Sequence, residues 1–117
     1  MKLHPDIYPL LESLGFPAFI QGDMPENMEY PETFITYIWY TSADLWQFDN
    51  RAIATNYTCQ VSVYSKFPDQ IDETITKLVE ILLKNGYSKA DGGRMIPSDE
   101  PSHLGWTIDF NYIVKES

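Results

Sequence analysis

Three stretches of the chain alternate between apolar and polar residues in the way that β-strands do. Residues 53–65 and 104–114 place apolar side chains at nearly every second position, the pattern of a half-buried antiparallel strand. Residues 33–40 are β-branched or aromatic throughout, so both faces of that strand are largely apolar and can be covered. In 104–114 we expect one face to point inward (Leu104, Trp106, Ile108, Phe110, Tyr112 and Val114) and Thr107, Asp109 and Asn111 to point outward.

Two other stretches have helical spacing. Residues 68–85 carry a stripe of apolar side chains (Ile71, Ile75, Leu78, Val79 and Leu82), with Pro68 in the first turn and Gly86 as a stop. Residues 4–15 carry Ile7, Leu10, Leu11 and Leu14 at the same spacing. Because proline is tolerated only in the first turn of a helix, this second helix is expected to be short and to begin near Pro5 or Pro9.

The remaining segments are less regular. Residues 16–20 read as a short extended piece and 22–31 as a loop with two prolines. Residues 41–51 read as a polar connection between two strands, and Arg94–Ile96 as a strand fragment. The elements predict one domain spanning residues 1–117. Its fold class is α+β, a single antiparallel sheet of about four strands with helices packed on one face, in the order α-β-β-α-β-β.

Charge argues against nucleic-acid recognition. The chain has 117 residues, of which 8 are basic and 17 acidic, giving a net charge of −9, and the basic residues are scattered. A nucleic-acid binder needs a basic patch, so the acidity indicates solubility and repulsion from DNA. The lone Cys59 excludes an intrachain disulfide, and the apolar runs are too short to span a membrane. The N-terminal stretch lacks signal-peptide character, so we expect a cytoplasmic, soluble protein.

Catalytic and metal-binding patterns are weak. A nucleophilic Cys59 would need His103 within reach, but its strand position predicts a buried structural cysteine. Asp109 is flanked by apolar residues yet falls on the polar face of its strand. Neither zinc nor calcium spacing is present, and Gly92-Gly93 follows no strand–helix junction that could cradle a phosphate. The sequence therefore predicts no enzymatic activity, no cofactor and no metal.

Large aromatic residues point instead to docking. Trp46 and Phe48 lie in the polar connection, where they either anchor a partner or fold back over the sheet edge, and the sequence leaves both readings open. For Trp39, inside a predicted strand, packing against the sheet is the favoured reading.

Three segments taken together resemble a known family. These are PETFITYIWYTSADLWQFDNR (31–51), YTCQVSVYSK (57–66), and a helix followed by KNGYSKADGG and HLGWTIDFNY. Their order and spacing resemble the small tail-completion proteins of long-tailed bacteriophages and prophages, the tail terminator or head–tail joining class. The resemblance spans roughly residues 5–114, and no single motif in it is diagnostic.

The resemblance implies a structural virion protein with no enzymatic activity and no cofactor. Such proteins are α+β and form rings, typically hexamers, at the head-proximal end of the tail tube. Their partners are copies of themselves, the tail tube protein and the head connector proteins. DNA passes through the central channel without specific binding, and no membrane is involved. The implied location is the virion tail, with the host cytoplasm during assembly.

A head-to-tail ring needs two different patches on each subunit. The candidate interface residues are those around the predicted connection: Tyr40, Trp46, Phe48, Asp49, Asn50 and Arg51. An acidic channel would also let DNA pass without sticking. The tail tube subunit itself fits less well, because tube subunits need a long hairpin and more strands. The alternatives are a stand-alone bacterial adaptor domain that binds another protein, and a small enzyme using Cys59 or Asp109.

Overall fold

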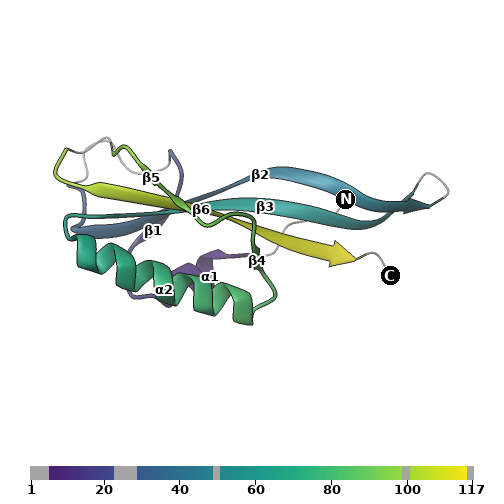
Figure 1. Ribbon diagram of the computed structural model, residues 1–117, viewed down its shortest axis with the longest axis horizontal. Helices are drawn as coiled ribbons and strands as arrows, with labels where there is room; N and C mark the ends of the chain where they lie inside the picture. Colours follow the sequence, from purple (N-terminus) through teal and green to yellow (C-terminus); the bar gives the residue numbers. More distant parts are fainter. Residues whose placement is uncertain (1–5, 23–28, 49–50, 99–100, 116–117) are drawn as a thin grey trace.

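The computed structural model describes residues 6–22, 29–48, 51–98 and 101–115. In chain order its elements are α1 (Tyr8–Glu12), β1 (Ala18–Ile20), β2 (Thr33–Phe48), β3 (Arg51–Ser65), α2 (Pro68–Lys84), β4 (Ser88–Lys89), β5 (Arg94–Ile96) and β6 (Leu104–Lys115). The strands form one twisted sheet, and both helices lie against the same side of it (Figure 1). The molecule is elongated, measuring 53 × 28 × 23 Å.

The sheet confirms the expected single layer but corrects its details. The strand order is β1-β2-β3-β6-β4, with β5 also paired to β6, so the described residues form six strands and not four. The predicted element order was also wrong, because β1 precedes β2 and β4 follows α2. Strands of two or three residues cannot carry a periodic pattern, which is why these were missed or read only as fragments. The sheet is mixed, because β1 pairs with β2 in parallel.

The prediction of a connecting segment at 41–51 was wrong. Strand β2 continues to Phe48 and β3 begins at Arg51, with pairing from Thr33↔Ser65 to Phe48↔Arg51. The register shifts between Trp39 and Thr41, which marks a β-bulge. One extra residue moves the alternation by one position, so a pattern read from 33–40 appears to end there. The polar residues beyond the bulge also belong to strand β2, because their backbones pair with β3.

The hydrophobic core lies between the sheet and the two helices. Both predicted helices are confirmed, with Pro9 and Pro68 in their first turns. The fully buried side chains of this layer come from three strands, both helices and the residue that precedes α1 (Ile35, Cys59, Val61, Val63, Phe110, Leu78, Leu82, Leu11 and Ile7). The predicted apolar stripe of α2 faces this core, with Ile71, Leu78 and Leu82 buried and Ile75 and Val79 half-buried.

The opposite face of the sheet, which we call the open face, carries mainly polar side chains along β3 and β6, with the aromatic rings of Phe34 and Tyr64 at one end. Two of its hydroxyls are buried and paired, since Ser62 Oγ donates to Thr107 Oγ1 at 3.0 Å and Thr107 donates to the Val61 carbonyl at 3.2 Å. Thr107 lies on this outward face as expected, but it is buried there, where it contacts Ser62 and where β5 pairs alongside it. Leu104, expected to point inward, is 41% exposed because it opens β6 at the margin of the core.

Candidate functional site

The outer edge of β2 is only partly covered. Strand β1 pairs with it at Ile35–Tyr37, where the Ile35 N–H donates to Pro17 O and the Tyr37 carbonyl accepts from the Gln21 N–H, both at 2.9 Å. Further along, residues 42–48 have no strand partner on that side among the described residues. Alternate residues of an antiparallel strand turn their N–H and C=O away from the partner. Past the bulge, the register with β3 shows that Ser42, Asp44 and Trp46 are the residues whose N–H and C=O point away from β3.

The outer edge of β6 shows the same arrangement on the other border of the sheet. Strand β5 pairs with residues 105–107 and β4 with residues 110–111, and the Ala90 N–H donates to Asp109 O at 2.8 Å. Beyond these pairs, residues 112–115 have no strand partner on that side within the described ranges. Asp109 uses its outward carbonyl, so by alternation Ile113 also presents its N–H and C=O outward.

The two uncovered edges lie at the same end of the sheet. Through β3, Ser42 is level with Tyr57 and Tyr112, and Asp44 is level with Thr55 and Val114. This end of β2, β3 and β6 extends beyond α2 (Figure 1). We call these stretches, residues 42–48 and 112–115, the two open edges. An exposed strand edge is a template for pairing with another chain.

The sequence-predicted interface residues fall near the first of these edges. Tyr40, Trp46 and Phe48 belong to β2, and Arg51 begins β3 opposite Phe48. Asp49 and Asn50 lie outside the described residues. The structure therefore brings three of the six onto the partly uncovered strand. Their role as contact residues stays a prediction.

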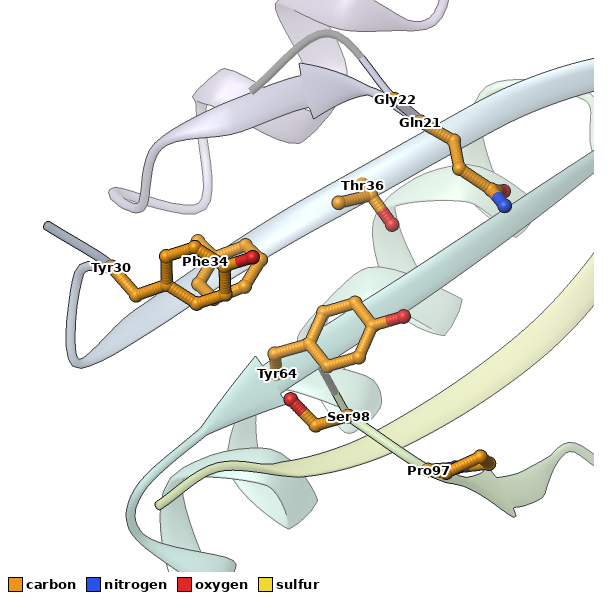
Figure 2. Close-up of a pocket in the computed structure, with 8 residues that line it drawn as sticks. All are labelled: Gln21, Gly22, Tyr30, Phe34, Thr36, Tyr64, Pro97 and Ser98. Carbon is orange, nitrogen blue, oxygen red and sulfur yellow. The ribbon is translucent and has the colours of Figure 1, made fainter. Parts of the chain in front are cut away.

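A pocket of about 300 Å³ lies on the open face near the other end of the sheet (Figure 2). Its lining comes from four separate parts of the chain: Gln21 and Gly22 after β1, Tyr30, Phe34 and Thr36 entering and within β2, Tyr64 of β3, and Pro97 and Ser98 after β5. The pocket thus spans the width of the sheet. Sequence reasoning missed it, since only the folded sheet brings these positions together. The available signal was the pair of large aromatic residues Phe34 and Tyr64, each on the strand face that points away from the predicted core.

Aromatic rings build one side of this pocket. The rings of Phe34 and Tyr64, directly opposite each other in the β2–β3 pair, are stacked at a centroid distance of 5.0 Å. Tyr30 meets Phe34 edge-on at 5.5 Å. Phe34 is only 3% exposed, whereas Tyr30 and Tyr64 are half-buried. The two tyrosines therefore carry most of the aromatic surface that a ligand could touch.

His103 fastens the chain next to these rings. It is buried, and its Nε2 donates to the Pro31 carbonyl at 2.7 Å, while Nδ1 lies 3.1 Å from Ser102 Oγ. A carbonyl oxygen only accepts, so Nε2 carries the proton. The ring also packs against Phe34 at 5.6 Å. His103 thus joins the start of β6 to the segment entering β2, a structural role that accounts for both of its nitrogens.

The candidate catalytic residues Cys59 and Asp109 lie on opposite faces of the sheet. Cys59 is fully buried beneath the helices, on the face of the sheet opposite the open-face pocket. Asp109 is half-buried on β6, where its backbone N–H donates to Asp91 Oδ1 at 3.3 Å. In the part of the chain that is described, no three His, Cys, Asp or Glu side chains gather closely enough to hold a metal ion. Across the same ranges, none of the helices could cross a lipid bilayer.

Burial of Cys59 predicts a loss of stability at alkaline pH. Removal from water raises the pKa of its thiol to about 12, aided by the nearby Asp109 charge and opposed by a hydrogen bond from the Ile38 backbone. The raised pKa means that the stabilisation is complete below the unfolded thiol's pKa of 9.0 and is lost as pH rises above it. We expect the unfolding free energy of the native chain to fall by about 1.4 kcal/mol per pH unit more steeply than that of Cys59→Ala.

Urea unfolding of both proteins between pH 8 and pH 10.5 measures this difference in slope. Parallel pH dependences would show that the Cys59 thiol ionises in the folded chain as easily as in water, and would contradict its placement in the core. The same placement predicts slow modification of Cys59 by a thiol reagent in the native protein and fast modification in urea.

Comparison with known proteins leaves the family open. No family model matches the chain, and no curated protein matches it. Function is therefore argued from the geometry of the pocket and the two open edges.

Proposed function

We propose that this chain is a structural component of a long-tailed phage virion, a tail terminator or head–tail joining protein that forms a ring at the head-proximal end of the tail tube. The observation that carries the proposal is the pair of open edges, one on each border of the sheet and level with each other at one end. The sequence resemblance to small tail-completion proteins agrees with it.

Two different edges on opposite borders favour a head-to-tail contact. Strands β2 and β6 are both antiparallel to β3, so they run in the same direction. When β2 of one copy meets β6 of the next, the two strands are parallel and the sheet continues from subunit to subunit. A contact between two different surfaces closes into a ring when the rotation between copies permits. Pairing of this kind satisfies the outward N–H and C=O groups of both edges.

The charge of the chain suits a ring with a channel for DNA. A net charge of −9 repels the phosphate backbone, so DNA passes as cargo without being bound. This part of the proposal predicts acidic side chains on the channel wall. A ring structure that places the acidic residues only on the outer rim would remove it.

Partners and location follow from the same proposal. The ring would contact the tail tube protein on one side and the head connector proteins on the other, and would reside in the virion tail after assembly in the host cytoplasm. A tail tube subunit was expected to fit less well because such subunits need a long hairpin. Strands β2 and β3, with 16 and 15 residues, form a long hairpin, so this objection no longer holds. The tail tube role is therefore a second candidate that this hairpin favours.

Native mass measured over a range of protein concentrations, first alone and then with purified tail tubes, tests the proposal. We expect a discrete ring, either in solution or on tube ends. Incorporation along the whole length of the tube, instead of at its end, would identify a tube subunit. A monomer that ignores tubes at every concentration contradicts the proposal and supports the adaptor alternative.

A further inference from the structure

A second hollow, which we call the α2 cleft, lies on the side of the sheet that carries the helices. Its lining comes from the start of α2, from β5 and from the start of β6 (Pro68, Ile71, Asp72, Met95, Leu104, Gly105 and Trp106). In Figure 1 the starts of α2 and β6 lie at the same end of the molecule, away from the end of the sheet that extends beyond α2. The α2 cleft is therefore separate from both open edges.

The α2 cleft presents apolar side chains to solvent. Met95 is 66% exposed and Leu104 is 41% exposed, and Trp106 is half-buried directly opposite Met95 in the β5–β6 pair. Ile71 belongs both to the hydrophobic core and to the lining, so the cleft reaches down to the core. Methionine is unbranched and adapts its shape, which suits it to surfaces that bind apolar groups. A partner that covers these side chains removes them from water, which favours association.

The volume of the α2 cleft fits one large apolar side chain. It measures about 160 Å³, and an apolar cavity of roughly 150 Å³ holds a benzene ring. In protein interfaces, a side chain that fills such a pocket supplies much of the binding energy. A free small molecule fits less well, because small-molecule sites typically measure roughly 300–1,000 Å³.

Carboxylates lie beside the apolar part of the cleft. Asp72 lines it and is exposed, and Asp69 is exposed on the same face of α2, three residues earlier. The neighbouring cations along the chain, Lys66 and Arg94, are not part of the lining. Arg94 pairs with Asp91 at 3.3 Å and precedes Met95 in β5, so its side chain points to the opposite face of the sheet. A basic group of a partner is therefore attracted to this border of the cleft.

We propose that the α2 cleft binds a segment of a partner protein that inserts one large apolar side chain and places an adjacent arginine or lysine against Asp72 and Asp69. The exposed apolar lining selects the inserted side chain, and charge complementarity selects its basic neighbour. This docking surface goes beyond ring assembly and does not depend on it, because the cleft and the open edge at 112–115 lie at opposite ends of β6.

Amide NMR of the full chain, titrated with blocked pentapeptides, tests the proposal. The peptides share the sequence Gly-X-Phe-X-Gly, in which X is arginine, serine or glutamate, and a fourth peptide replaces the phenylalanine of the arginine peptide with glycine. We expect the arginine peptide to shift the signals of Met95, Leu104 and Trp106 and to bind most tightly. The glutamate peptide should bind least tightly of the three, and the peptide without phenylalanine should not bind. The advantage of arginine over serine should shrink as salt is added, because exposed charge pairs are screened.

Two variants and a matched control assign the contacts. Asp72→Asn should weaken binding of the arginine peptide about 2- to 5-fold and leave the serine peptide unaffected. Glu80→Gln makes the same change of charge at an exposed position of α2 outside the cleft lining, and should alter neither affinity. Met95→Gln replaces the apolar end of a long side chain with an amide, and should weaken both peptides about 3- to 10-fold.

Several results would overturn the proposal. These are an arginine peptide that shifts no signal of the cleft, a glutamate peptide that binds as tightly, and equal effects of Asp72→Asn and Glu80→Gln. Benzyl alcohol that binds as tightly as the arginine peptide would also overturn it, since the cleft would then be a small-molecule site. The native mass of Met95→Gln is expected to match that of the unsubstituted chain, so failure of this inference is distinguishable from failure of the ring.

Discussion

Replacing Asp44 with proline is expected to stop self-assembly while leaving the subunit folded. Asp44 is a position whose N–H points away from β3, so proline there removes an outward donor and keeps the β2–β3 hydrogen bonds. Each subunit contact then leaves a buried carbonyl of the neighbour without a partner, at a cost of about 1–3 kcal/mol. That is a factor of about 5–150 in the dissociation constant of each contact, and a ring closes only if every contact holds.

Asp44→Ala is the control, since it removes the same carboxylate but keeps the N–H. Native mass at matched concentrations compares the two variants, and circular dichroism reports their folding. Assembly lost equally in both would assign the effect to the carboxylate and not to the strand edge. Assembly retained in Asp44→Pro would contradict a role for this edge.

Gly93→Ala is expected to destabilise the fold by about 2–5 kcal/mol. Gly93 has a φ of +85°, and a Cβ there would press against the Trp106 indole nitrogen and lie 2.7 Å from Ile108 Cγ1. The left-handed backbone costs an L-residue about 1–2 kcal/mol, and overpacking adds about 1–3 kcal/mol. Gly93 also lies in the connection between β4 and β5, where its N–H donates to Asp91 Oδ1 at 3.1 Å.

Gly15→Ala separates these two contributions. Gly15 has a similar φ of +91°, but a Cβ there meets no atom within 4 Å. We expect it to lose only the backbone part, about 1–2 kcal/mol. Urea unfolding of the three proteins measures both values. Equal losses at the two glycines would show that the close approach of Gly93 to β6 does not constrain the fold.

The parts of the fold that were predictable are those whose signal is local. The stripe of α2 and the alternation of β3 are each set by neighbouring residues, so the sequence reveals them and their buried faces. The bulge between Trp39 and Thr41 defeats the same reasoning, because a one-residue shift looks like the end of a strand. Hence β2 appeared to stop near Tyr40 when it continues to Phe48.

The candidate sites depend on pairings between distant residues. The parallel partnership of β1 with β2, and the short β4 and β5 along β6, decide which edges remain open. None of these strands is longer than three residues, so none of them shows an alternating pattern that could be recognised in the sequence. The pocket likewise joins Gln21, Tyr64 and Pro97, which only the folded sheet brings together. The docking residues expected in a 41–51 connection fall instead in β2 and at the start of β3, and their docking role stays a prediction.

The most direct test of head-to-tail assembly is the native mass of a mixture of two edge variants. Asp44→Pro blocks the β2 edge and keeps the β6 edge, whereas Ile113→Pro, at an outward position of β6, does the reverse. Under the condition in which the unsubstituted chain assembles, each variant alone should remain a monomer, and an equal mixture should give a 1:1 dimer that cannot grow. A dimer of Ile113→Pro alone, or a mixture that stays entirely monomeric, would contradict the pairing of β2 with β6 between subunits.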